Sequence, residues 1–174
     1  MTLPALALSL LLAAPPTATP PAKAADPWAA LRFLVGTWKA EAGGGKPGEA
    51  TGGGFIFGIE LDGKVAVRRS RSEFAPLPGE TKGTAHEDLM VLYPKGSGIQ
   101  ALYWDDEGHV IRYDVRSEAG TLIFESEPGP PGPRFRLVYA RRGADVVEIA
   151  FSIARPGKGF EPYLTGLARR IEDP

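Results

Sequence analysis

A train of ten short segments, each followed by a turn signal, constrains this chain more than any other feature of its sequence. Glycine, proline and aspartate separate the segments, as in Asp62-Gly63 and in the Gly/Pro run at 129–133. Short strands at regular spacing, without a long helix between them, are typical of an antiparallel meander. We therefore predict an all-β fold, an antiparallel meander closed into a barrel of about ten strands. The predicted strands are residues 37–42, 54–61, 64–74, 84–93, 98–105, 109–117, 121–127, 134–141, 146–154 and 163–171.

Alternation along each strand predicts which side chains point into the barrel. In the hairpin around residues 105–108, pairing Trp104 with His109 sets the register and places Gln100 opposite Tyr113. This register predicts that four side chains line the interior together: Gln100, Trp104, His109 and Tyr113.

The strand at 64–74 breaks the pattern, because arginines occur on both of its faces. Whichever face points inward, at least one arginine lines the interior. We expect Arg68 or Arg69 to orient a polar or acidic group of a bound molecule.

Residues 1–24 are predicted to be a signal peptide. The apolar run from Leu3 to Ala14 is too short to span a bilayer, and Ala22-Lys23-Ala24 suits signal peptidase, with cleavage after Ala24. The mature chain is then expected to be secreted or periplasmic, without a membrane span. Residues 36–174 would form the barrel domain.

Residues 25–35 form a lead-in for which we predict one short helix. Asp26 can cap it, and Trp28, Leu31 and Leu34 fall on one side. Such a helix would plug or cover one mouth of the barrel. The alternative is a loosely ordered lead-in.

Cysteine and charge usage exclude several classes of site. The chain has no cysteine, which rules out disulfides, thiolate metal sites and cysteine nucleophiles. With 20 basic and 21 acidic residues, it offers no electrostatic case for binding nucleic acid. We expect a monomer or a homodimer.

Two ends of the barrel region carry a resemblance to a known fold family. Gly36-Thr37-Trp38, together with Arg169-Arg170 near the C-terminus, resembles the signature of the calycin and lipocalin-like barrels. The resemblance implies that a late arginine packs across the first-strand tryptophan, a cation-π contact worth about 1 kcal/mol. The sequence leaves open which of Arg169 and Arg170 does so. Residues 103–113 look like the central hairpin of uncharacterised bacterial lipocalin-like families with secreted members.

Residues 31–38 are also similar to the start of nitrobindin-like haem-binding barrels. Those proteins supply an axial histidine to haem from the last strand, and the corresponding residues 160–167 contain no histidine. We therefore predict no cofactor, with haem as the alternative.

The chain has two histidines, His86 and His109, and a metal site built from both is the alternative to ordinary hydrogen bonding at the barrel rim. His86 and Asp88 share one face of their strand. No nucleophile elbow accompanies Ser70, His86 and Asp88, so no catalytic residues are predicted.

These observations predict a secreted barrel that binds a small, largely apolar molecule in its interior. One alternative is a haem- or metal-binding barrel with redox or isomerase-type activity. The other is a non-catalytic interaction module of the cell envelope, suggested by the outward stripe Arg112, Asp114 and Arg116.

Overall fold

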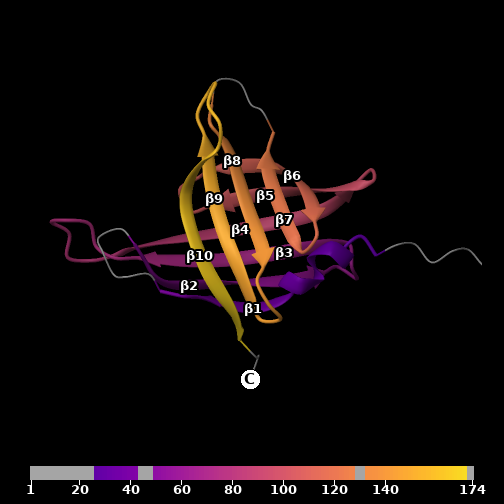
Figure 1. Ribbon diagram of the computed structural model, residues 1–174, viewed down its shortest axis with the longest axis horizontal. Helices are drawn as coiled ribbons and strands as arrows, with labels where there is room; N and C mark the ends of the chain where they lie inside the picture. Colours follow the sequence, from indigo (N-terminus) through magenta and orange to yellow (C-terminus); the bar gives the residue numbers. More distant parts are fainter. Residues whose placement is uncertain (1–25, 43–48, 128–131, 172–174) are drawn as a thin grey trace, which may run out of the picture.

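The protein is a closed ten-stranded antiparallel barrel, as the sequence predicts (Figure 1). The computed structural model describes residues 26–42, 49–127 and 132–171, so the predicted signal peptide at 1–24 lies outside the described residues. Its elements are η1 (Ala29–Leu34), β1 (Gly36–Ala40), β2 (Ala50–Glu60), β3 (Val65–Phe74), β4 (Thr84–Lys95), β5 (Gly98–Asp105), β6 (Val110–Glu118), β7 (Thr121–Ser126), β8 (Arg134–Arg141), β9 (Val146–Ala154) and β10 (Glu161–Ile171).

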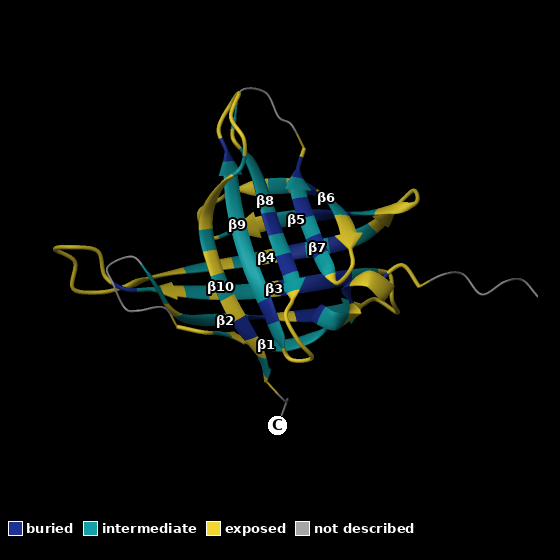
Figure 2. Ribbon diagram, in the orientation of Figure 1, coloured by how far each residue is buried: buried dark blue, intermediate teal, exposed yellow. Residues whose placement is uncertain are grey.

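Each strand pairs with the next along the chain, and the last pairs with the first. The closing pair runs from Thr37 opposite Ile171 to Ala40 opposite Ala168. Closure leaves no strand edge without a partner. In Figure 1 the wall formed by β2 to β5 runs crosswise to the wall formed by β8 to β10. Figure 2 shows buried residues recurring along the strands, whereas the connections at both ends are mostly exposed.

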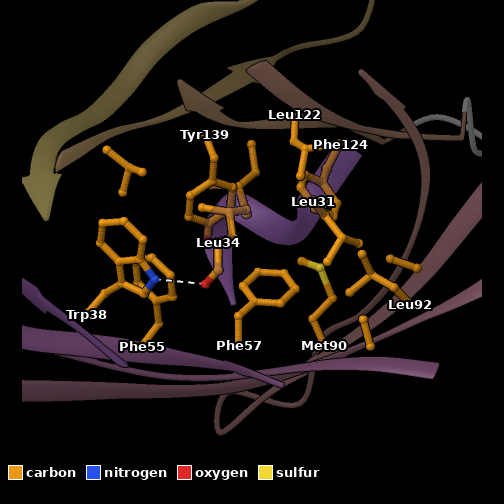
Figure 3. Packing of buried hydrophobic residues seen from close by; sticks show 14 of the residues in the cluster. Leu31, Leu34, Trp38, Phe55, Phe57, Met90, Leu92, Leu122, Phe124 and Tyr139 are labelled. Carbon is orange, nitrogen blue, oxygen red and sulfur yellow. Dashed lines mark hydrogen bonds between the residues drawn. The ribbon is translucent and has the colours of Figure 1, made fainter. Parts of the chain in front are cut away.

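The predicted lead-in helix is present as a 3-10 helix that plugs one end of the barrel. A 3-10 helix has about three residues per turn, so residues three apart share one side, and Trp28, Leu31 and Leu34 are all buried. Figure 3 shows Leu31 and Leu34 among aromatic and aliphatic side chains of the strands. The Trp28 indole donates to the carbonyl of Gly63 at 2.7 Å, which fixes the plug to the β2–β3 turn.

Trp38, on the first strand, packs between the plug and the last strand. Its indole nitrogen donates to the carbonyl of Leu34 at 2.8 Å (Figure 3), and the guanidinium of Arg170 lies 4.3 Å from the centre of its ring system. A Cβ on Gly36, whose φ is +123°, would lie 2.6 Å from an Arg170 nitrogen. Glycine is therefore favoured at position 36 for two reasons: it adopts this backbone conformation without strain, and it leaves room for the Arg170 side chain.

The structure also distinguishes the two late arginines. Arg170 donates to the carbonyls of Phe33 and Val35, so it ties the plug to the last strand. Arg169 points outward and binds the carboxylate of Glu41 at 2.6 Å. Arg170 is thus the arginine that packs on Trp38.

None of the helices in the described residues has the length and apolar character that crossing a membrane requires.

Candidate functional site

The barrel is closed at the plugged end and opens toward the other. Along β9, Val147 near the plug is fully buried, whereas Ile149 and Phe151 further along the same face remain partly exposed. Along β4, Leu92 and Met90 are buried at 0% exposure. We call the open part of the interior the mouth half; its inward-facing side chains include Ser70, His86, Tyr103, Ile111, Ile149 and Phe151.

A polar layer of Arg68, Asp88 and Tyr139 separates the plugged half from the mouth half. Arg68 shares the inward face with Phe57 and Met90, which lie directly opposite it on β2 and β4. Its two terminal nitrogens donate to the Asp88 carboxylate and the Tyr139 hydroxyl. The side chains of Arg68 and Asp88 are 6% and 7% exposed. Among the described residues, Arg68 Nε is the one buried side-chain polar atom without a hydrogen-bond partner.

The charge state of the polar layer follows from its contacts. Burial opposes the charge on Arg68, but Tyr139 and Asp88 outweigh burial and raise the pKa of the guanidinium. Burial raises the pKa of the Tyr139 hydroxyl, which Arg68 only partly offsets, and burial also raises the pKa of nearby Tyr113. The layer is therefore an ion pair accompanied by neutral hydroxyl groups.

A second group of hydrogen bonds links Tyr103 in the mouth half to the rim of the mouth. The Tyr103 hydroxyl donates to Asp105 Oδ2 at 3.2 Å and lies 3.0 Å from His86 Nε2. Asp105 Oδ1 accepts the amides of Glu107 and His109 at 3.1 and 2.8 Å. Burial alone would raise the pKa of Asp105, but the donors from His109 and Tyr103 outweigh it and lower that pKa. Burial raises the pKa of Tyr103, so its hydroxyl keeps its proton.

The predicted register of the β5–β6 hairpin is wrong by one residue. Trp104 pairs with Val110 instead of His109, and Tyr113 pairs with Ala101 instead of Gln100. The cause is the Asp105 carboxylate, because it binds the His109 amide and holds that residue in the turn. A one-residue shift moves a side chain to the other face of a sheet. Tyr113 points inward as predicted, while Gln100 and Trp104 point outward.

The outward residues have partners of their own. Gln100 is covered by Tyr93, Lys95 and Asp114, which hydrogen-bond its amide at 2.9 to 3.1 Å. Arg69 also points outward, binding Glu60 at 3.0 Å, so Arg68 is the arginine that enters the interior.

Trp104 is 37% exposed and belongs to an outer apolar row that crosses several strands. In this row Leu89 pairs with Trp104, and Trp104 pairs with Val110. On the other side of Leu89, Arg69 pairs with both Leu89 and Ile56. An open groove of about 760 Å³ passes over Ile56, Leu89 and Trp104.

The two histidines do not meet as a pair of metal ligands. The His109 ring binds Asp105 at 2.8 Å and is 56% exposed. In the described part of the chain, the group of potential metal ligands whose atoms lie within 4.8 Å of one another is His86, Asp106 and Glu107.

Sequence reasoning missed the roles of Tyr139, Tyr103 and Asp105. Each looks ordinary along the chain: two alternating core tyrosines and a turn aspartate. The one available signal was a pair of opposite charges, Arg68 and Asp88, at inward positions of two neighbouring strands.

Compared with models of protein families and with curated proteins, the chain matches none of either. The fold is compatible with a lipocalin-like barrel, and the site must be interpreted from its own geometry.

Proposed function

We propose that the protein binds a small, largely apolar molecule in the mouth half of its barrel. The supporting observation is a change in burial along the inward faces: side chains beside the plug are fully buried, whereas those beyond the polar layer are partly exposed. One side of this half is apolar and aromatic, since Phe135 and Phe151 stack with ring centres 6.0 Å apart and Ile111 and Ile149 flank the interior. Ser70, His86 and Tyr103 add polar groups to the opposite side. An apolar cavity with a few convergent polar groups is the usual form of a small-molecule site.

The polar layer gives such a molecule an orientation. Arg68 Nε–H is a buried donor without a protein acceptor, and a buried unpaired donor is unfavourable by about 1–3 kcal/mol. Because Asp88 already balances the charge of Arg68, the layer favours a carbonyl or hydroxyl oxygen over a second carboxylate. The ligand is then an apolar molecule with a neutral polar end that accepts a hydrogen bond.

The proposed ligand contacts differ from the sequence-based set. Arg68 and Tyr113 remain near the proposed site, and His109 lies at its rim. Gln100, Trp104 and Arg69 point away from it, so we assign them no role in binding.

We also propose that binding takes place outside the cytoplasm, in the periplasm or after secretion. The support is the apolar run and the small residues at Ala22 and Ala24. N-terminal sequencing of the protein recovered from the periplasm or medium of an expressing bacterium tests this.

Fluorescence of the apolar probe N-phenyl-1-naphthylamine tests the binding proposal. Probe emission should rise on adding the protein and should fall at least tenfold in Ile111→Trp, which fills the mouth half from the inside. Val110→Trp is the matched control, because Val110 directly precedes Ile111 in the chain, points outward and is 64% exposed. Equal probe binding in both variants, or no binding by the unaltered protein, would refute an interior site. Thermal unfolding of both variants checks that overpacking has not disrupted the fold.

A further inference from the structure

His86 stands at the rim of the mouth with its two ring nitrogens in different surroundings. Nε2 lies 3.0 Å from the Tyr103 hydroxyl. Nδ1 lies 3.3 Å from a carboxylate oxygen of Asp106 and 3.3 Å from one of Glu107.

The hydrogen bonds around Tyr103 determine which His86 nitrogen carries a proton. Asp105 accepts from two backbone amides, from the His109 ring and from the Tyr103 hydroxyl, so it acts as an acceptor on both oxygens. A tyrosine hydroxyl has one proton, and that proton is donated to Asp105. The Tyr103 oxygen can therefore only accept from His86, which requires the proton on Nε2.

That assignment leaves Nδ1 directed toward two carboxylates. A neutral ring then presents a lone pair to two negative groups, an arrangement that a cation between them stabilises. Metal-bound histidines typically donate their other N–H to a fixed oxygen acceptor, as His86 does to Tyr103.

The distances from His86 Nδ1 to the two carboxylate oxygens also fit a metal ion. Donors about 2.0 to 2.2 Å from zinc lie about 2.8 to 3.6 Å apart around an octahedron or a tetrahedron. Both separations from Nδ1 are 3.3 Å, within this range, and the three donors all lie within 4.8 Å of one another.

The backbone that carries the two carboxylates is held in place. The Asp106 amide donates to the Glu87 carbonyl at 3.0 Å, and the Glu107 amide donates to Asp105 at 3.1 Å. Both carboxylates are exposed, at 47% and 64%, so a hydrated ion reaches them directly.

We propose that His86 Nδ1, Asp106 and Glu107 form a binding site for a divalent transition-metal ion at the rim of the barrel mouth. One imidazole and two carboxylates suit Zn²⁺, Mn²⁺ or Fe²⁺, and water completes the coordination. His109 lies beside the site and outside the ligand group: its Nδ1 binds Asp105 at 2.8 Å and is 3.9 Å from the other carboxylate oxygen of Glu107. The site does not depend on the proposed function: His86 also lines the mouth half, but metal binding requires only His86, Asp106 and Glu107.

Isothermal titration of the untagged, metal-free protein with Zn²⁺ tests the proposal. We expect one ion per chain, no measurable binding in His86→Ala, and affinity reduced at least tenfold in Glu107→Gln. Glu118→Gln is the matched control: Glu118 is also an exposed glutamate, at 68%, paired with an arginine, and its removal should leave zinc affinity unchanged. If the unaltered protein takes up no zinc, or if Glu107→Gln binds zinc as well as Glu118→Gln does, the site does not exist.

Tyr103→Phe tests the assigned tautomer. It keeps the aromatic ring but removes the partner of Nε2–H, and loss of such a partner typically lowers metal affinity about 10- to 100-fold. Nitrogen-15 NMR of the two histidine rings gives a readout independent of affinity. In the metal-free protein His86 should carry a proton on Nε2 only, and zinc should shift the Nδ1 resonance. A His86 ring protonated on both nitrogens and insensitive to zinc would show an imidazolium bound by two carboxylates, and would overturn the metal site.

Discussion

At the scale of single residues, two neighbouring arginines on β3 have opposite environments. Arg68 is buried against Asp88, whereas Arg69 and its partner Glu60 are 61% and 44% exposed. Removing one member of a buried ion pair leaves an uncompensated charge, which destabilises a protein by about 3–5 kcal/mol. We expect that loss in Arg68→Met, and less than about 1 kcal/mol in Arg69→Met, because exposed pairs contribute little.

A double variant separates the charge from the shape of the Arg68 side chain. Arg68→Met combined with Asp88→Leu removes both charges and should recover at least half of the lost stability. Urea unfolding gives the free energies. A double variant less stable than Arg68→Met would contradict the interpretation of the pair as mutually compensating charges.

The other informative pair is Arg170 and Arg169. Arg170→Met removes two hydrogen bonds to backbone carbonyls and the contact with Trp38, so we expect a loss of about 2–4 kcal/mol. Arg169→Met removes an exposed pair with Glu41, and the loss should stay below about 1 kcal/mol. Thermal unfolding of the two variants side by side makes the comparison; equal losses would mean that the contact with Trp38 adds no stability.

At the scale of elements, the plug helix is held by packing rather than by its own hydrogen bonds. It has only six residues, too few to form alone in water. Leu31 is fully buried within it, so Leu31→Ala should reduce the free energy of unfolding by about 2–5 kcal/mol. Ala30, which is exposed on the same helix, is the control, and Ala30→Ser should change stability by less than about 0.5 kcal/mol. A small effect of Leu31→Ala in urea unfolding would show that the plug is not part of the cooperative core.

Strands were predictable from this sequence because the signals that define them are local. Alternation and turn residues placed β5, β8 and β9 at the bounds that the structure has. The helix was predictable as an apolar stripe of period three, although its 3-10 form was not anticipated. The hairpin register was not predictable, because it depends on a hydrogen bond that the His109 amide donates to the Asp105 carboxylate.

At the scale of the whole molecule, the polar layer depends on contacts that no local pattern encodes. Arg68 and Tyr139 are 71 residues apart in the chain and meet only because the barrel closes. The sequence placed Tyr139 on the inward face and left the choice between Arg68 and Arg69 open. Register and closure decide it, since both depend on all ten strands at once.

Burial of tyrosines in the barrel makes its stability sensitive to alkaline pH. Burial raises the pKa of Tyr139 and Tyr113 above the ordinary value of about 10. Above pH 10 the unfolded chain therefore loses protons that the native barrel keeps, so the free energy of unfolding falls as pH rises. Below pH 10 both states are protonated, and the contribution is fully present. Each tyrosine should contribute a slope of about 1.4 kcal/mol per pH unit between its unfolded and folded pKa.

Urea unfolding at pH 8, 9, 10.5 and 11 measures this slope, and tyrosinate absorbance at 295 nm follows ionisation in the same samples. Arg68 stays charged throughout, and the comparison of Tyr113→Phe with Tyr163→Phe assigns the change to the buried tyrosines. Tyr113→Phe should reduce the slope above pH 10, because it removes one of three such protons: burial raises the pKa of Tyr103 as well as those of Tyr113 and Tyr139. Tyr163→Phe is the control: Tyr163 is 73% exposed, and its loss should leave the slope as it is. Constant stability up to pH 11, or equal slopes in the two variants, would mean that the interior tyrosines ionise without opposition and that water enters the barrel as far as the polar layer.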